Sequence, residues 1–234
     1  MRAIKLFLAG LIAVTGIATQ AQTVDEIVSK HVDAMGGADN WKKITSLKRE
    51  GSFNVQGNDV TLTITVLNNK GLRQDISVGG TAGYVIVTPT AGWSFLPFQG
   101  QSEVEAMPAE TLKDRQQGLD IAGALIDYKA KGHKAELLGK ETIDGVECYK
   151  IRLTLSNGNV ATDYVDTKNY YVVRNISTLH ANGQEMEQTT SFSNFQKLPE
   201  GIVVAMTITQ QFGDIIINKV EVNKPVDESI FKAG

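Results

Sequence analysis

The pattern of apolar and polar residues first follows a helical period and then changes to a strand period. From residue 24 to residue 35 apolar side chains recur at helical spacing, and the glycine pair Gly36-Gly37 follows. This pattern predicts an amphipathic helix that ends at a glycine. A second helical turn, with Trp41, is expected over residues 38–44. Beyond it, the pattern predicts mostly strands.

Residues 59–67 alternate strictly, with Val60, Leu62, Ile64 and Val66 on one face and threonines on the other. Such alternation is typical of an antiparallel strand with one buried face. Turn signals such as Asp144-Gly145 separate similar runs at short intervals, which indicates a long meander of hairpins. The further strands are expected at residues 47–55, 72–78, 84–88, 146–155, 160–166, 170–179, 185–195, 202–212 and 215–222.

Alternation is lost over residues 102–131, where helix-forming residues are frequent. We therefore expect a helical insertion in the sheet. Just before it, Trp93, Phe95, Leu96 and Phe98 lie in a stretch that reads as a loop. So much apolar area outside regular strands needs a cover or a ligand.

The N-terminal segment has the features of a secretory signal peptide. Arg2 and Lys5 precede an apolar run over residues 6–17, and small residues follow up to Ala21. The run is shorter than the roughly 20 residues that cross a bilayer. We expect cleavage near Ala21, a periplasmic location, and one domain over residues 22–234, with no membrane span.

Charge and cysteine content exclude other classes. Without residues 1–21, 21 Lys and Arg stand against 26 Asp and Glu, so the net charge is about −5 and a nucleic-acid partner is not expected. The single cysteine, Cys148, has no partner for an internal disulfide and is expected to be a small buried side chain.

No motif predicts an enzyme, a metal site or a cofactor. His31, His133 and His180 are scattered and are expected on the surface or in hairpins. Asp163 and Asp166 are spaced to point to opposite faces of a strand, so they form no carboxylate pair by local geometry. Catalytic groups assembled from distant strands are the open alternative.

Three segments suggest a family: "IVSKHVDAMGGADNWKKITSLKREGSF", "GKETIDGVECYKIRLT" with "YVDTKNYYVVR", and "VNKPVDESIFK". They resemble exported bacterial proteins of the outer-membrane lipoprotein-sorting (LolA and LolB-like) group, and the resemblance covers nearly the whole chain after the signal peptide. It implies a mainly β, α+β fold: an unclosed antiparallel barrel whose apolar concave face holds acyl chains beneath a helical lid. No lipidation cysteine follows the apolar run, so the soluble LolA-like carriers are the closer relatives. The group's latch arginine would correspond to Arg49 or Arg73.

The function that this resemblance implies is a periplasmic carrier or chaperone for lipidated proteins, with inner- and outer-membrane transfer partners and with residues 102–131 as a movable lid. Two alternatives are a carrier of free lipid or another hydrophobic molecule, and a non-transporting envelope sensor or interaction protein whose cavity is filled. The candidate cavity residues are Leu62, Ile64, Val66, Ile76, Val78, Trp93, Phe95, Phe98, Leu112, Leu119, Ile126, Met206 and Ile208.

Overall fold

The structure is a computed structural model that describes residues 22–55, 57–181 and 184–233. The expected signal peptide, residues 1–21, lies outside the described residues. The helices are α1 (Val24–Ala34), α2 (Ala38–Trp41), α3 (Ala109–Arg115) and three 3₁₀ turns, η1 (Pro97–Gln99), η2 (Gln116–Leu119) and η3 (Glu228–Phe231). The strands are β1 (Ser46–Val55), β2 (Asn58–Leu67), β3 (Gly71–Val78), β4 (Thr81–Val87), β5 (Gly92–Phe95), β6 (Glu105–Ala106), β7 (Lys134–Ile143), β8 (Val146–Thr154), β9 (Val160–Asp166), β10 (Val172–Ala181), β11 (Gln184–Lys197), β12 (Val203–Gln210) and β13 (Gly213–Val222).

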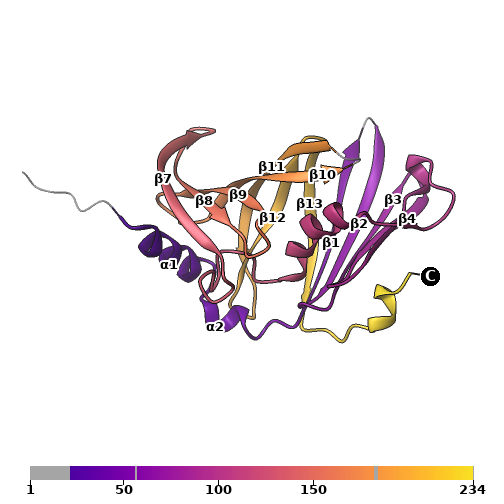
Figure 1. The fold of residues 1–234 in the computed structure, drawn as a ribbon, viewed down its shortest axis with the longest axis horizontal. Coiled ribbons are helices and arrows are strands. Elements are labelled where there is room, and N and C mark those ends of the chain that lie inside the picture. Colours follow the sequence, from indigo (N-terminus) through magenta and orange to yellow (C-terminus); the bar gives the residue numbers. More distant parts are fainter. Residues whose placement is uncertain (1–21, 56, 182–183, 234) are drawn as a thin grey trace, which may run out of the picture.

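All the described strands belong to one antiparallel sheet, in the order β6-β5-β4-β3-β2-β1-β13-β12-β11-β10-β9-β8-β7. The two end strands, β6 and β7, do not pair with each other, so the sheet curves without closing (Figure 1). The chain runs out along one half, crosses over, and returns to place β13 beside β1. This architecture confirms the prediction of an unclosed, strongly curved antiparallel sheet.

Three strands were not predicted. β7 alternates poorly because most of its residues are exposed, and its register with β8 shifts between Leu137 and Gly139. The segment around Trp93, which reads as a loop in the sequence, forms the short strand β5 and pairs with both β4 and β6. Within the expected helical insertion, over residues 102–131, only α3 and η2 are helical; β6 and irregular turns make up the rest.

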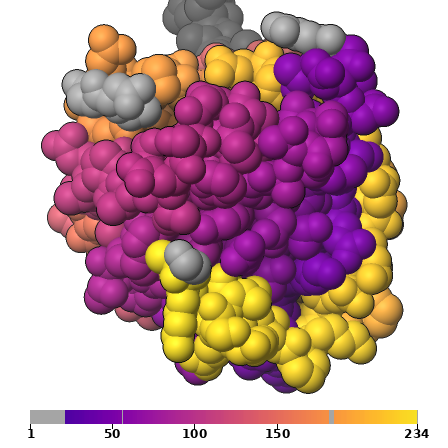
Figure 2. Space-filling view, turned by 90° about the vertical axis from the view of Figure 1, so that its right-hand side faces the viewer, coloured from indigo at the N-terminus to yellow at the C-terminus, as the bar shows by residue number. Residues whose placement is uncertain are grey.

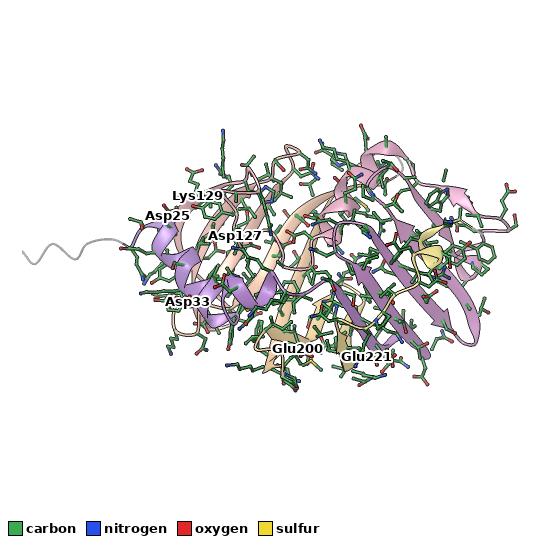
Figure 3. The ribbon with its side chains drawn as sticks, turned by 90° about the horizontal axis from the view of Figure 1, so that it is seen from below. Asp25, Asp33, Asp127, Lys129, Glu200 and Glu221 are labelled. Atoms are coloured by element: carbon green, nitrogen blue, oxygen red, sulfur yellow. The ribbon has the colours of Figure 1, made fainter. Side chains whose placement is uncertain are left out.

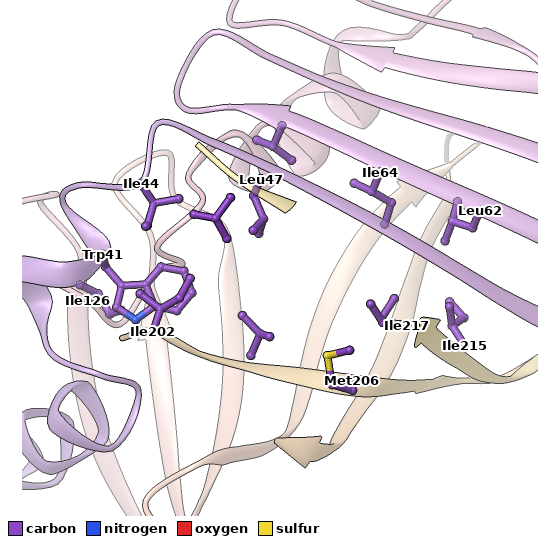
Figure 4. Packing of buried hydrophobic residues seen from close by; sticks show 13 residues of the cluster. Trp41, Ile44, Leu47, Leu62, Ile64, Ile126, Ile202, Met206, Ile215 and Ile217 are labelled. Atoms are coloured by element: carbon purple, nitrogen blue, oxygen red, sulfur yellow. The ribbon is translucent and has the colours of Figure 1, made fainter. Parts of the chain in front are cut away.

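The inner face of the sheet carries the core. The alternating apolar residues of β2, Val60, Leu62, Ile64 and Val66, are buried, and the last three pack with residues of β12 and β13, including Met206, Ile215 and Ile217 (Figure 4). On the other half, Ile27 and Val28 of α1 pack against Ile151 of β8. Cys148 is fully buried, and burial raises the pKa of its thiol to about 11.

Residues 109–131, which we call the cover segment, lie across the inner face and join both halves of the core. Ile126 packs with Trp41 and Ile202 in one cluster (Figure 4), while Leu125 packs with Ile151 in the other. Lys129 also forms an ion pair with Asp25 of α1, with 2.5 Å between Nζ and Oδ2 (Figure 3).

The C-terminal segment packs on the outer face. Phe231 is buried there against Gly71, and Arg73 donates from Nη1 to the carbonyl of Ile230 at 3.0 Å. Figure 2 shows this segment in yellow against the purple and magenta strands. The elements that pack on the inner face are instead α1, α2 and the cover segment.

The corner between α1 and α2 is fixed to the start of β12. Val203 donates its backbone N–H to the carbonyl of Met35 at 3.0 Å, and Trp41 donates from Nε1 to the same oxygen at 2.8 Å. Gly36, at φ 101°, lies so close to Gly201 that a methyl group on it would overlap the Gly201 carbonyl oxygen. Only glycine fits this approach.

We expect Gly36→Ala to destabilise the fold more than Gly37→Ala. Both glycines have positive φ, so each alanine carries a backbone strain of roughly 1–3 kcal/mol. Only the methyl at Gly36 meets another part of the chain, since nothing lies within 4 Å of a methyl at Gly37. Urea denaturation of the two variants measures the difference, and equal losses would contradict the close packing of this corner.

Candidate functional site: a cavity beneath the cover segment

A cavity of about 390 Å³ lies between the inner face of the sheet and the cover segment. Most of the side chains around it are apolar. They come from both halves of the sheet, for example Leu47 of β1, Leu153 of β8, Ala161 of β9 and Val204 of β12, while residues 117–118 and 120–126 of the cover segment form the opposite wall. Three charged or titratable groups, Arg49, Asp163 and His31, also reach this space from α1 or the sheet.

Arg49 lies on the inner face of β1, opposite Ile64 of β2 and Val220 of β13. Its Nε is buried and has no hydrogen-bond partner among the described residues, and no ion pair within 4.0 Å involves its guanidinium there. Burial lowers the pKa of the guanidinium, but an arginine remains protonated at physiological pH. The wall of the cavity thus carries an uncompensated positive charge.

Asp163 lies on the inner face of β9, where it is paired in register with Asn175 of β10. Asn175 donates from Nδ2 to Oδ1 of Asp163 at 2.7 Å. Burial raises the pKa of the Asp163 carboxyl from 3.8 to about 6, against the opposing effect of this hydrogen bond. Asp166 accepts bonds from Lys168 and Asn169 in the turn that follows, so it serves the turn rather than the cavity.

His31 is buried, which corrects the expectation that it lies at the surface. Its position one turn after Ile27 puts it on the inner face of α1, and its Nδ1 lies 2.8 Å from the carbonyl oxygen of Tyr170. Burial lowers the pKa of the imidazole, so the neutral form is favoured, with Nδ1–H donating to that carbonyl. The helical spacing of His31 from Ile27 could have predicted that its side chain is buried.

The cover segment is anchored to β10 through a buried carboxylate. Asp114 of α3 accepts hydrogen bonds from the backbone N–H of His180 at 2.6 Å, from its Nδ1 at 3.0 Å and from Nδ2 of Asn159 at 2.9 Å. Thr111 of the same helix donates to the His180 carbonyl at 2.8 Å. The carboxylate of Asp114 raises the pKa of His180. Sequence reasoning missed this anchor because its members come from three distant segments.

A second attachment joins the cover segment to the turn between β2 and β3. Asn69 donates its backbone N–H to the carbonyl of Leu119 at 2.8 Å, and Ile121 donates to Oδ1 of Asn68 at 3.1 Å. The cover segment is thus held by side-chain and turn contacts and not by a strand ladder.

Of the predicted cavity residues, Val66, Ile126 and Ile208 line the cavity. Leu62, Ile64 and Met206 are buried in the packed cluster beside it, with Ile76 against the same cluster. Leu112 and Leu119 of the cover segment pack instead with Val85 and Val87 of β4.

The structure does not bring Trp93 or Phe95 to the cavity. Trp93 pairs with Ile86 and Phe95 with Tyr84, so both lie on the face of the sheet opposite Val85 and Val87, which contact the cover segment. Phe98 follows in η1, near Gly83, and Val78 is half-buried at the end of β3; neither lines the cavity.

Of the two candidate latch arginines, Arg49 faces the cavity and Arg73 lies on the outer face. Arg73 pairs with Asp75 at 2.8 Å and stacks over the ring of Tyr84. Arg49 makes no hydrogen bond to the cover segment, all of whose residues are described. In this structure neither arginine latches the cover.

Two further findings concern the part of the chain that the structure describes. It holds no group of three or more His, Cys, Asp or Glu side chains arranged to bind a metal ion. None of its helices has the length and hydrophobicity that a transmembrane helix needs.

Comparison with solved structures identifies the fold. A LolA superfamily protein from Nitrosomonas europaea superimposes with a TM-score of 0.56 at 13% identity, covering 91% of this chain and 98% of that one. A DUF1329 family protein from Desulfovibrio piger gives 0.55 at 14% identity, with the same coverage of 91% and 98%. A putative outer membrane lipoprotein-sorting protein domain from Vibrio parahaemolyticus gives 0.50 at 14% identity, covering 88% and 94%.

No protein-family model matches the sequence, and no curated protein is significantly similar to it. At 13–14% identity the structural likeness establishes the fold and not the activity. The predicted resemblance to LolA-like proteins is therefore confirmed in the fold.

We expect Asp163 to contribute a loss of stability as the pH rises from about 4 to about 6, relative to a variant in which this carboxyl is absent. The folded state retains a proton on this carboxyl, with a pKa of about 6, over a range in which the unfolded chain has lost it. Across this window the difference costs up to about 3 kcal/mol of unfolding free energy. Asp163→Asn keeps the acceptor for Asn175 and removes this cost, so the unfolding free energies of wild type and variant should separate between about pH 4 and pH 6 and stay apart by a constant amount above pH 6. Parallel pH profiles would contradict a buried, titrating Asp163.

We expect Asp114→Asn to loosen the cover segment, because the amide presents a donor where three donors converge. The loss of buried hydrogen bonds to a charged group should lower the local opening free energy by about 1–3 kcal/mol. Hydrogen exchange over residues 109–131 should then be about 5- to 150-fold faster. The control is Asp127→Asn in the same segment, which removes an exposed ion pair to Lys42 of 2.9 Å and should change exchange little. Unchanged hydrogen exchange in Asp114→Asn would contradict the conclusion that Asp114 anchors the cover segment to β10.

Proposed function

We propose that this protein is an exported, periplasmic carrier that binds an acyl chain of a lipid or lipidated protein between its curved sheet and the cover segment. The cavity of about 390 Å³ is the observation that carries the proposal. It falls within the roughly 300–1,000 Å³ typical of small-molecule sites, and apolar side chains make up most of its wall. The names of the Nitrosomonas and Vibrio proteins of the same fold agree with this class of function.

The size of the cavity favours one chain over several. A water molecule takes about 30 Å³ in the liquid, and a methylene group is of similar size, so the cavity has room for on the order of a dozen methylene groups. Each buried methylene contributes about 0.8 kcal/mol. A free single-chain lipid thus fits the cavity as it stands, whereas the several chains of a lipoprotein require the cover segment to move outward.

The way the cover segment is attached supports loading and release. Its contacts with the sheet are the Asp114 anchor, hydrogen bonds to three turns between strands, and apolar packing. Opening these contacts breaks no strand pairing, so it costs less than separating two strands of the sheet. A carrier needs a cover that opens at a lower free-energy cost than the sheet unfolds, since its cargo must leave while the sheet stays folded.

The alternative of an interaction protein with the same fold requires a filled interior. The described residues leave the cavity open beside a well-packed core, and this favours binding. No geometry among the described residues favours an enzyme.

We expect Ala161→Phe to abolish most acyl-chain binding. Ala161 lies on the inner face of β9 in the cavity wall, and a phenyl ring there takes the place of several methylene groups of the ligand. At about 0.8 kcal/mol per methylene, affinity for a twelve-carbon amphiphile should fall by at least about tenfold. Calorimetric titration of delipidated protein with dodecanoate and with monododecanoyl glycerol measures this loss.

The matched control is Ala82→Phe, which adds the same ring at an exposed position of β4 away from the cavity. It should bind both amphiphiles as the wild type does. Wild-type protein that binds neither amphiphile would overturn the proposed function, and equal binding by Ala161→Phe would place the ligand elsewhere.

A further inference from the structure

We propose that Arg49 receives the acidic head group of the ligand, so that the cavity selects a single-chain amphiphile with a carboxylate or phosphate head over a neutral one. The inference rests on the proposed function and adds the chemical class of the ligand. It starts from a contrast between Arg49 and the two residues beside it on β1.

Lys48 and Glu50 point to the outer face, and both are paired. Lys48 lies 2.7 Å from Glu50, and Lys219 of β13 lies 3.7 Å from the same carboxylate. Arg49, between them, points to the inner face, where its cross-strand neighbours are Ile64 and Val220. The charges of β1 are thus balanced on the outer face and unbalanced on the inner face.

The acidic side chains that line the cavity are committed to other partners. Asp163 is bonded to Asn175, and Asp120 of the cover segment forms an ion pair of 2.5 Å with Lys131. Four strands, β13, β12, β11 and β10, separate the strand of Asp163 from β1 in the sheet. Within the described residues, no carboxylate lies within the 4.0 Å of Arg49 that an ion pair requires.

An unpaired buried cation is costly, and pairing it recovers part of that cost. Taking an ion out of water into the interior costs several kcal/mol unless an opposite charge and hydrogen bonds compensate. The guanidinium has five donors in a planar fork that matches the two oxygens of a carboxylate or phosphate. A ligand with such a head group supplies the acceptor that the protein lacks, while its chain occupies the apolar part of the cavity.

A structural role for Arg49 leads to the opposite expectation for stability. If the side chain stabilised the fold, replacing it with an uncharged residue would lower the melting temperature. If the charge is retained for a ligand, Arg49→Met, which keeps an unbranched apolar side chain, should raise the melting temperature of the ligand-free protein. This measurement also identifies a variant that fails to fold.

The test compares four twelve-carbon amphiphiles on delipidated protein below their micelle concentrations: dodecanoate, dodecyl phosphate, dodecanol and dodecyltrimethylammonium. Wild type should bind at least one of the two anions about tenfold or more tightly than dodecanol, since hydrogen bonds to a charged group are worth about that factor. The affinity for dodecanoate compared with that for dodecyl phosphate distinguishes a preference for a fatty-acid head group from a preference for a phospholipid head group. The cation should bind weakest.

Arg49→Met should bind dodecanol as well as the wild type does and lose the preference for the anions, and Arg49→Lys should keep part of it. The control, Arg73→Met, removes an arginine of the outer face and should leave all four affinities unchanged. Equal wild-type affinity for anions and dodecanol, or an anion preference that survives in Arg49→Met, would overturn the inference while leaving the proposed function intact. Binding of none of the four by wild type would instead overturn the proposed function.

Discussion

The burial of the concave face of one open sheet is the constraint on which the rest of the structure depends. A sheet that curves this far without closing presents apolar side chains from both of its halves toward the same space, and the described residues form no second sheet to cover them. α1, α2 and the cover segment supply that cover, and each contributes apolar residues to it. These short helices and turns do not fill the concave face completely, and a cavity of about 390 Å³ remains between them and the sheet.

The polar groups inside this space lower the stability of the protein. An arginine whose buried Nε has no partner among the described residues, and a carboxyl whose pKa is raised by burial, both oppose folding. Natural proteins keep such groups mainly where they act on something else, and stability is regained elsewhere. Here two features offset the lost stability. One is the packed apolar cluster beside the cavity, which includes Trp41 and Ile217. The other is the carboxylate of Asp114, both of whose oxygens accept hydrogen bonds.

Local patterns predicted the strands that have one buried and one exposed face. β2 is the clearest case, because the alternation of Val60 and Leu62 with threonines reports burial directly. β7 could not be predicted in this way, since an edge strand with little burial has no reason to alternate. The prediction of a loop around Trp93 was wrong for a related reason, because aromatic residues next to glycine and proline suggest a loop. Only the pairing of this segment with β4 shows that Trp93 and Phe95 lie on the outer face of the sheet.

The sequence indicated an apolar site, but it identified only some of the residues that line it, namely Val66, Ile126 and Ile208. Alternation indicates that a face is apolar, but which apolar residues border a space and which fill the core depends on how the two halves curve toward each other. Val66 and Leu62 share one strand face, yet only Val66 borders the cavity. The pairing of Asp163 with Asn175 depends on strand register, which a single sequence does not report.

The open ends of the sheet have a consequence for the behaviour of the protein at high concentration. Exposed edge strands are templates on which other chains can add strands, and a sheet of this length offers two such ends. β6 ends one of them after two residues, and β7 ends the other with Lys134, Glu136, Lys140 and Glu141 and with a register shift next to Gly139. Charges and an irregular ladder repel a second copy, so the features that hid β7 from sequence analysis protect the protein against edge-to-edge aggregation.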